Sequence, residues 1–524
     1  MAISNITEAT HIVFTAFAAW GHVRPFCILA ARLVQANENV VVTMILVPPF
    51  LKKAHAEISA EFRDTASESA RSRLRVLAPF KSDTENPFDL MPLITENYGR
   101  VYQAVVDGKP VSCATTGKSF EAVPPPKLSV IDFFAHPLML VTRSITGPSV
   151  PIVAWISGHM GTLIRFWGPE RFGGGGDIAK KVQEEVARTG APVHEVEERL
   201  YSFAKISIGK VVSIPGVPDM YDWEFFPQAL AFDLPFAEVI KWGQAGMKEA
   251  DSIFLTSTYS LEPITLDAAR SWYKEWNKEV YVIGPLLPTG YGTMRQSDRG
   301  SSEVSEFLDK ALVEHGEKSV TLISFGTVFW PKEQDYIEEV LEAFIEKKAP
   351  FIICYASMFA SMSDNILQKI KDSDLGLISR WIPQQYILSH KATGWFITHG
   401  GQNSVMESLG CGIPLICWPF EADQPASAAV LSKNLQVAIE LIEVRTGEKG
   451  FKPLLRLGHG PKGTREAVGE EIREVIDSCR GEKGALLREN ALKVKEAFAK
   501  TWEEGGDAIN EFRKFASAYN LQLL

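Results

Sequence analysis

A run of glycine and polar residues in the C-terminal half has the composition of a nucleotide-binding turn. Residues Gly394 to Thr398 indicate a buried strand, and His399 to Ser404 (His-Gly-Gly-Gln-Asn-Ser) a turn that leads into a helix. Glycine allows a ligand to approach the backbone closely, and the free N–H groups at a helix start attract anions. We therefore expect a diphosphate here, with side-chain donors from His399, Asn403 and Ser404.

A carboxylate follows this turn on the same helical face. Glu407 lies three and four residues beyond Ser404 and Asn403, a spacing that places the three side chains together. A carboxylate beside a phosphate is unfavourable unless it accepts hydrogen bonds from hydroxyl groups, and a ribose offers two. The stretch therefore predicts a nucleotide site.

A candidate general base lies near the N-terminus. His22 stands just before Pro25 at the start of a predicted helix, where the positive end of the helix dipole disfavours an imidazolium ion. We expect a neutral imidazole, which can act as a base. Asp132 is the one carboxylate in the apolar strand Lys127 to Phe134 and lies near its C-terminal end, where sites form in α/β proteins. The competing histidines, which nothing in their sequence surroundings favours, are His136 and His159.

Taken together, these residues resemble the signature box of the UDP-glycosyltransferase family that glycosylates small molecules. The resemblance is to a soluble, microbial or fungal relative of the plant enzymes, and it covers nearly the whole chain. Its motifs occur in order as Gly21-His22, Ile283-Gly-Pro285, Ser324-Phe-Gly-Thr327 and the box from Trp381 to Gln424. It implies the GT-B architecture, in which two Rossmann-like, doubly wound α/β domains face a central cleft.

The resemblance also implies how UDP is held. Trp381 should stack on the uracil, and Gln384 and Glu407 should hold the ribose. The residues expected around the diphosphate are Gly326, Thr327, His399, Gly400, Gly401, Asn403 and Ser404.

Three further residues are expected at the donor sugar. Asp423 and Gln424 should bind its hydroxyls, and Gln402 is grouped with them. Gln424 is the glucose-associated choice in the resemblance, so UDP-glucose is favoured over UDP-xylose, UDP-galactose and UDP-glucuronate. Gln402 stands where many plant members have Trp, and Ile156 replaces a hydroxyl residue that often touches the sugar, so both departures leave the donor preference open.

The implied reaction is a direct, inverting displacement. His22 removes the acceptor's proton, Asp132 orients His22, and UDP leaves from the opposite face of the sugar. Helix N-terminal dipoles and His399 stabilise the departing diphosphate, so neither a metal nor another cofactor is expected. Asp372-Ser-Asp374 imitates the metal-binding DxD of a different glycosyltransferase fold, but it falls in a predicted solvated loop.

Two series of strand, helix and strand must position these groups. The first comprises His11 to Phe17, a helix reaching Ala36, and Val40 to Val47; the second comprises Ser319 to Phe325, a helix over Tyr336 to Lys348, and Phe351 to Tyr355. The expected division is an acceptor domain over residues 1–275, a linker over 276–305, a UDP-sugar domain over 306–500, and a helix over 501–524 that packs back on the first domain. Residues 164–235 are expected to be irregular and to carry recognition loops.

The composition excludes some partners. The formal net charge of −10 over 524 residues disfavours nucleic acid, which needs clustered Lys and Arg. The 6 cysteines form no CxxC pair and are expected to be reduced core thiols, which fits a cytoplasmic protein. No segment reaches about 18 uninterrupted apolar residues, so no membrane span is expected. A monomer is the default.

The acceptor is expected to be a small lipophilic molecule with rings, such as a phenolic, terpenoid or sterol-like compound, because Phe and Trp are abundant in the N-terminal half. Two other functions remain open at this point. One is a UDP-sugar-binding subunit without catalysis, and the other is a UDP-sugar epimerase that acts on the donor alone.

Overall fold

The computed structural model describes residues 9–62, 68–232, 235–288, 290–292 and 302–521. Its N-terminal half contains a sheet of 7 parallel strands in the order β11-β10-β7-β6-β1-β2-β3. Strands β1, β2 and β7 are buried along their whole length, as expected when both faces of a parallel sheet are covered by helices. The strands are β1 Thr10–Thr15, β2 Val40–Ile45, β3 Leu74–Leu77, β6 Leu128–Asp132, β7 Ile152–Ile156, β10 Ser252–Leu255 and β11 Glu279–Val282.

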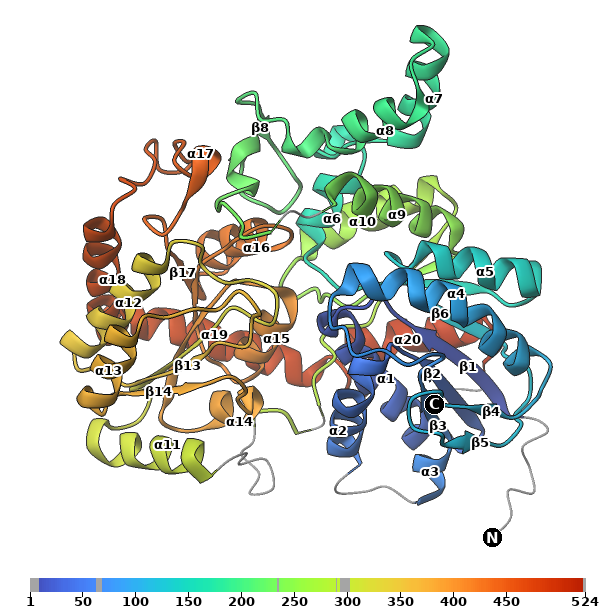
Figure 1. Ribbon diagram of the computed structural model, residues 1–524, viewed down its shortest axis with the longest axis horizontal. Helices are drawn as coiled ribbons and strands as arrows, with labels where there is room; N and C mark the ends of the chain where they lie inside the picture. The colour runs from blue at the N-terminus through green and yellow to red at the C-terminus, as the bar shows by residue number, and fades with distance from the viewer. Residues whose placement is uncertain (1–8, 63–67, 233–234, 289, 293–301, 522–524) are drawn as a thin grey trace.

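The helices of this half flank the sheet on both sides (Figure 1). They are α1 Trp20–Ala36, α2 Leu51–Glu61, α3 Glu68–Ser72, α4 Pro87–Val106, α5 His136–Thr146, α6 Met160–Trp167, α7 Ile178–Thr189, α8 Val193–Tyr201, α9 Phe236–Glu249 and α10 Pro263–Glu275. Two short antiparallel pairs lie outside the main sheet, β4 Val111–Ser112 with β5 Ser119–Phe120 and β8 Val211–Val212 with β9 Met220–Tyr221.

The C-terminal half contains a second parallel sheet of 6 strands in the order β14-β13-β12-β15-β16-β17. Its strands are β12 Val320–Ser324, β13 Phe351–Cys354, β14 Gly376–Ser379, β15 Thr393–Thr398, β16 Leu415–Cys417 and β17 Ala438–Glu440. Its helices are α11 Ser302–His315, α12 Gln334–Glu346, α13 Asp364–Ser373, α14 Gln384–Ser389, α15 Gln402–Gly410, α16 Gln424–Ala429, α17 Gly447–Gly450, α18 Arg465–Arg480 and α19 Glu482–Lys500.

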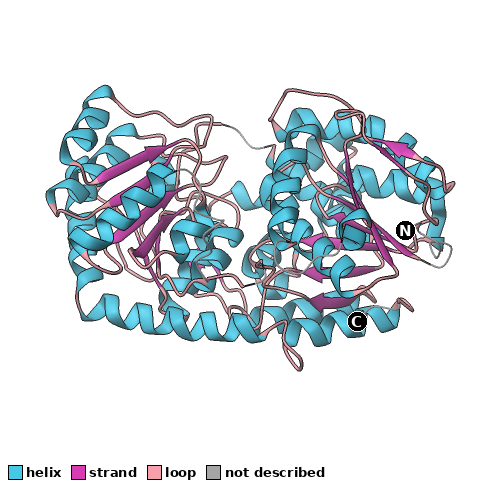
Figure 2. Ribbon diagram, turned by 90° about the horizontal axis from the view of Figure 1, so that it is seen from below, coloured by secondary structure: helices cyan, strands magenta, loops and turns pink. Residues whose placement is uncertain are grey.

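The chain then returns to the first sheet through α20 Asp507–Ala518. Phe515 packs on Phe254 of β10, with ring centroids 4.5 Å apart, and on Tyr281 of β11 at 5.3 Å. The Tyr519 hydroxyl donates to Ser252 Oγ at 2.7 Å. Figure 2 shows the last helices running along one side of the molecule from one sheet to the other.

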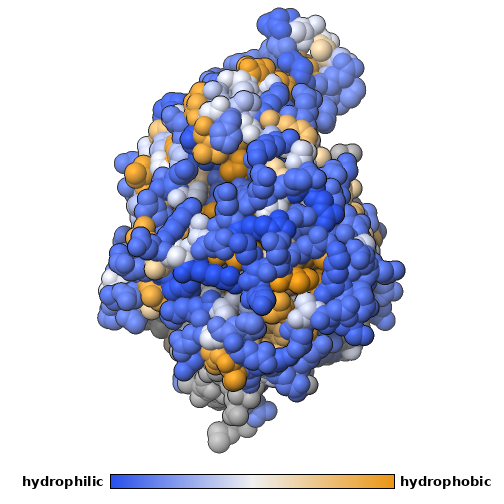
Figure 3. Space-filling model, turned by 90° about the vertical axis from the view of Figure 1, so that its left-hand side faces the viewer, coloured by the Kyte–Doolittle hydropathy of each residue, from blue (hydrophilic) through white to orange (hydrophobic). Residues whose placement is uncertain are grey.

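The outer surface of the C-terminal half is mainly charged. Arg465 pairs with Glu339, and Arg473 pairs with Glu339 and Glu346, so that α12 and α18 are joined by ion pairs where they meet solvent. Figure 3 shows this side as mostly hydrophilic, with apolar patches that are separate from one another. This face therefore offers no broad apolar surface.

The expectation of an irregular segment over residues 164–235 is wrong for a good part of its length. Helices α7 and α8 occupy 178–189 and 193–201, and they extend away from the body of the molecule (Figure 1). The apolar signal was weak because α7 buries only Ile178 and Val182 among charged neighbours. In the predicted linker, residues 279–282 form β11 and residues from 302 onward belong to α11, while position 289 and residues 293–301 lie outside the described residues.

A second contact between the two halves was not foreseen from the sequence. The Gln228 amide donates to Val444 O at 2.9 Å, and Thr446 N donates to Pro227 O at 3.0 Å. Beside them, Arg456 pairs with the buried carboxylates Glu224 and Glu440. The two halves are therefore held together at this edge by a buried charged network, in addition to the contact of α20 with the first sheet.

Candidate active site

His22 and Asp132 form a close pair at the edge of the first sheet. His22 lies in the first turn of α1, which follows β1, and Asp132 is the last residue of the neighbouring strand β6. His22 Nδ1 donates to Asp132 Oδ2 at 2.7 Å, and Asp132 Oδ1 accepts from Phe134 N at 2.9 Å. Because a carboxylate only accepts, Nδ1 carries the hydrogen and Nε2 remains free to take a proton.

The protonation of His22 differs from the sequence expectation. Burial lowers the pKa of His22, but the charge and hydrogen bond of Asp132, with a further contribution from Asp423, more than offset it and raise the pKa above its ordinary value. The expectation that the start of α1 keeps the ring neutral is therefore wrong in direction. The two carboxylates stabilise the charged form of the ring by more than burial and the helix dipole destabilise it. His22 acts as a base only once it has lost this proton.

Aromatic rings surround the histidine on the side of the first domain. The His22 ring lies 5.7 Å from Phe17 and 5.5 Å from Phe134, and Phe17 lies 6.1 Å from Phe88, measured between ring centroids. The His22 side chain keeps 19% of its surface exposed, whereas Asp132 is fully buried. A molecule that reaches Nε2 therefore meets an apolar, ring-lined wall.

The predicted diphosphate turn is built around His399. Its imidazole lies against Gly326 and Gly401, where an added Cβ would come within 3.2 Å and 2.6 Å of the ring, so Gly401 has no room for a side chain. Gly400 has a φ of +85°, which favours glycine. Burial lowers the pKa of His399 to about 4, so it can offer an N–H group but not a positive charge. His399 thus lies between Gly401 of the turn and Gly326, which follows β12, whereas Thr327, the next residue of the chain, is exposed.

Helix α15 begins directly after this turn. Its N-cap residue, Gly401, has no side chain to cap the helix, and among the described residues only Gln402 N of this first turn donates to a side chain, Asp423 Oδ2. The other N–H groups of the first turn are available to an anion. Ser404 is half-buried in the first turn of the helix. The Asn403 amide donates to Gly21 O at 2.7 Å, so it links α15 to the residue before His22.

The two residues predicted at the ribose are in contact. Gln384, the first residue of α14, donates from Nε2 to Glu407 Oε2 on α15. Trp381 lies three residues before Gln384 in the loop after β14, and 69% of its surface is exposed. An exposed indole next to a ribose site suits a stacking platform for a base.

Two of the predicted sugar residues, Asp423 and Gln424, lie at the start of α16, and the third, Gln402, is the first residue of α15. Asp423 Oδ2 accepts from Gln402 N at 3.4 Å and lies close to Gly158 of the first half. Gln424 Oε1 accepts from Phe420 N at 2.9 Å, which leaves its Nε2 as a donor. The side-chain Nε2 of Gln402 is buried and has no hydrogen-bond partner in the described part of the chain.

His159 does not replace His22 as a base. It is buried at the start of α6, and burial lowers its pKa to about 4. Its Nε2 lies 3.1 Å from Glu262 Oε1, which also accepts from Met160 N at 2.8 Å. Burial raises the pKa of Glu262 to about 7. This pair fixes the start of α6 beside Asp423.

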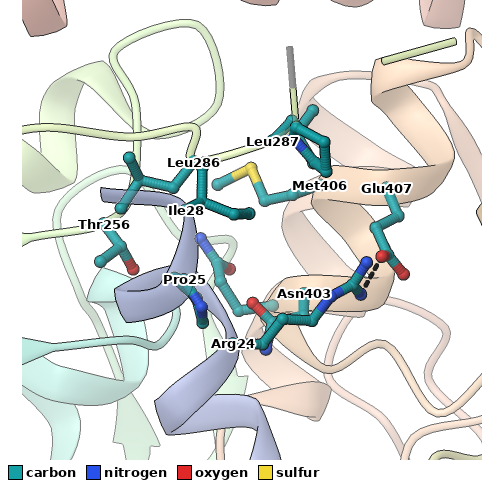
Figure 4. Close-up of a pocket in the computed structure, with 11 residues that line it drawn as sticks. Arg24, Pro25, Ile28, Thr256, Leu286, Leu287, Asn403, Met406 and Glu407 are labelled. Carbon is teal, nitrogen blue, oxygen red and sulfur yellow. Dashed lines mark ion pairs between the residues drawn. The ribbon is translucent and has the colours of Figure 1, made fainter. Parts of the chain in front are cut away.

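Arg24 is the residue at this site that the sequence reasoning missed. It projects from α1 across to Glu407 and lines a small cleft between the two halves, together with Pro25, Ile28 and Thr256 (Figure 4). The cleft holds about 20 Å³, room for about one water molecule. The sequence signal that could have identified Arg24 is its positive charge two positions after the candidate base His22.

Two further features of the described residues concern metal binding and membrane spans. The described residues contain no cluster of three or more His, Cys, Asp or Glu side chains suited to a metal ion. Asp374 of the DxD-like sequence ends α13 and pairs with Lys310 at the surface. Among the described helices, none is both long and apolar enough to span a bilayer.

The protein has two α/β domains, each built on a parallel sheet, and a His–Asp pair of one domain lies against a glycine-rich turn and helix of the other. This arrangement defines the GT-B fold, and similar solved structures confirm it. A Medicago truncatula glycosyltransferase complexed with UDP-glucose has a TM-score of 0.67 at 16% identity and covers 99% of this chain and 100% of that chain. A Phytolacca americana enzyme complexed with UDP-2-fluoro-glucose and pterostilbene has a TM-score of 0.66 at 18% identity, covering 98% and 100%.

The sequence comparisons find similar proteins in one family. The family model described as UDP-glucoronosyl and UDP-glucosyl transferase matches residues 290–448. A UDP-glycosyltransferase of Hericium erinaceus, eriJ, is 29% identical over 96% of this chain and 97% of that protein. UDP-glycosyltransferase 84A1 of Arabidopsis thaliana is 34% identical over 53% of this chain and 54% of that protein. The chain is similar to UDP-glycosyltransferases over nearly its whole length and carries the domain of that family at residues 290–448, as the sequence motifs predicted.

Replacing Trp381 by alanine should weaken UDP binding by about 5- to 150-fold, because stacking of a base on an aromatic ring contributes about 1–3 kcal/mol. The indole is largely exposed, so the melting temperature should stay close to that of the wild type. Calorimetric titration with UDP and a thermal melt test both expectations. Unchanged affinity in a folded variant would place the uracil elsewhere.

Proposed function

We propose that this protein transfers glucose from UDP-glucose to a hydroxyl group of a small lipophilic acceptor, with inversion at the anomeric carbon and without a metal ion. The observation that carries the proposal is the His22–Asp132 pair, held beside the nucleotide turn by the contact of Asn403 with Gly21. A base from one domain and an anion site from the other meet at one interface. Similarity to UDP-glycosyltransferases supports the same donor class.

The chemistry follows from these groups. Nε2 of His22 takes the proton of the acceptor hydroxyl as its oxygen attacks C1 of the sugar. The bond between C1 and the diphosphate oxygen breaks, and UDP leaves from the opposite face, which inverts C1. The N–H groups at the start of α15 and the neutral His399 ring stabilise the negative charge that develops on the diphosphate. The resulting imidazolium is stabilised by Asp132.

Glucose is the favoured donor sugar. Gln424 is oriented by Phe420 N and keeps donor groups free, and Asp423 adds a carboxylate, so the pair can bind neighbouring hydroxyls. The Medicago truncatula and Phytolacca americana structures hold UDP-glucose and its 2-fluoro analogue, which supports the assignment for this chain. Xylose, galactose and glucuronate remain the competing sugars.

The acceptor class follows from the aromatic wall beside His22. Phe17, Phe88 and Phe134 present ring faces and edges, so a flat, apolar molecule with a single reactive hydroxyl is accommodated best. Phenolic, terpenoid and sterol-like alcohols fit this description. The pterostilbene bound to the Phytolacca americana enzyme is a phenolic molecule of this kind.

The proposal is tested by incubating the purified protein with each of the four UDP-sugars and a panel of phenolic, terpenoid and sterol acceptors. We expect UDP-glucose to give the fastest product formation by mass spectrometry, unchanged by EDTA, and a product with the β-anomeric configuration by NMR. Conversion of a UDP-sugar without acceptor would favour an epimerase. UDP binding without any product would favour a binding subunit, and loss of activity in EDTA would overturn metal independence.

A further inference from the structure

Arg24 connects the helix of the catalytic base to the predicted ribose carboxylate. It lies two residues after His22 on α1, and its Nη1 forms an ion pair with Glu407 Oε1 on α15 (Figure 4). Its Nε lies 3.2 Å from Glu57 Oε1 on α2. The Arg24 and Glu407 side chains keep only 16% and 3% of their surfaces exposed. The pair is therefore a largely buried contact between the two domains.

Glu407 depends on this contact for its charge. Burial raises the pKa of Glu407, and Glu57 adds to the rise, whereas Arg24 and the Gln384 amide lower it. The other titratable groups facing Glu407 are Tyr291 and Cys411. Arg24 is thus the one cation that the described residues place against Glu407, and removal of its charge leaves a buried carboxylate beside a second one.

An ionised Glu407 has the capacity that a ribose requires. A carboxylate offers about four lone-pair positions. Arg24 and Gln384 each use one, at Oε1 and Oε2, and two remain for a pair of neighbouring hydroxyls. A protonated carboxyl would lose part of this accepting capacity.

We propose that Arg24 is a positioning residue that fixes the Glu407 carboxylate for the 2′- and 3′-hydroxyls of the nucleotide and thereby joins ribose recognition to the helix that carries His22. The inference rests on the proposed function, since it takes Glu407 to contact the ribose. Asn403, which donates to Gly21 O, supplies a parallel link between the same two helices. Binding of the ribose and placement of the base are thus coupled through α1.

The experiment compares UDP with 2′,3′-dideoxy-UDP by calorimetry. The wild type should bind UDP at least about tenfold more tightly than the dideoxy analogue, because the analogue leaves buried acceptors unpaired. Arg24→Met should weaken UDP binding by about 10- to 100-fold and bind the analogue nearly as well as the wild type does, so most of the preference is lost. Arg24→Lys, which keeps the charge without the planar fork, should restore part of it.

Arg32→Met is the matched control. Arg32 is also a partly buried arginine of α1, but it donates to Leu287 O and lies over the Trp502 ring, 5.0 Å from its centroid. This variant should keep the full preference for UDP over the analogue. Arg24→Gln replaces Arg24→Met should the latter fail to fold by circular dichroism.

The pH dependence of UDP binding is a measurement that would not change if Arg24 had only a structural role. Without the Arg24 charge, the pKa of Glu407 rises further, so UDP affinity should fall at higher pH and more steeply than in the wild type as the pH is lowered. A wild type that binds both nucleotides equally would overturn the ribose assignment of the proposed function. A wild type that discriminates, with Arg24 variants that discriminate by the same factor at every pH, would overturn the Arg24 inference alone.

Discussion

Replacement of His22 by alanine should lower kcat by about 10²- to 10⁴-fold, the range for loss of a positioned general base. In the structure, His22 is the histidine that combines an oriented, partly exposed ring with a free Nε2, because its Nδ1 is held by Asp132 at 2.7 Å. UDP affinity should change by less than about threefold, since the nucleotide turn belongs to the other domain. Steady-state rates with saturating UDP-glucose, together with UDP calorimetry, measure the two quantities.

His136→Ala is the control for this experiment. His136 is the first residue of α5 and lies near the same edge of the sheet, but no described side-chain contact joins it to Asp132. Its loss should leave kcat within about twofold of the wild type. Undiminished transfer by a folded His22→Ala variant would show that another group removes the acceptor proton.

The positions of His22 and Asp132 were predictable because they follow from sheet topology. His22 comes after β1 and Asp132 ends β6, and these two strands are parallel neighbours whose carboxyl ends share one edge. A strand pattern read from the sequence was sufficient to bring together residues 110 positions apart. The glycine-rich turn before α15 was predictable for a similar reason, since Gly400 and Gly401 occupy conformations and spaces that exclude a side chain.

The interactions between the domains were not predictable in this way. The pKa of His22 depends in part on Asp423, and the charge of Glu407 depends on Arg24, so each partner comes from the opposite domain. No periodicity within one segment encodes such a pairing. Likewise α7 and α8 carry mostly charged surfaces, so they lack the apolar stripe that identifies a packed helix.

Replacement of Asp132 by asparagine should lower kcat by roughly 10²- to 10⁴-fold, although the side chain keeps its shape. An asparagine amide can donate to Nδ1, which places the ring hydrogen on Nε2 and removes the base from the acceptor's side. The variant also loses the charge that raises the pKa of His22. The remaining activity should therefore have its acid limb at lower pH than in the wild type, because the imidazole loses its proton more readily. The pH profile of kcat/KM measures this shift.

Asp251→Asn separates this effect from a general loss of stability. Asp251 also accepts a backbone hydrogen bond in the first domain, from Ile152 N at 2.7 Å, and it pairs with Arg143, but it lies at the opposite end of the strands from His22. This variant should melt at a lower temperature while its acid limb stays in place. An Asp132→Asn variant that behaves in the same way would reduce Asp132 to a structural residue.

Combining the substitutions gives the most direct test of the pair. If Asp132 acts only through His22, the double variant His22→Ala with Asp132→Asn should be about as active as His22→Ala alone, because the second change removes nothing further. If the two residues act independently, their losses should multiply. A double variant whose loss of activity equals the two single losses multiplied together would therefore contradict the proposal that Asp132 acts only by holding His22 through their 2.7 Å contact.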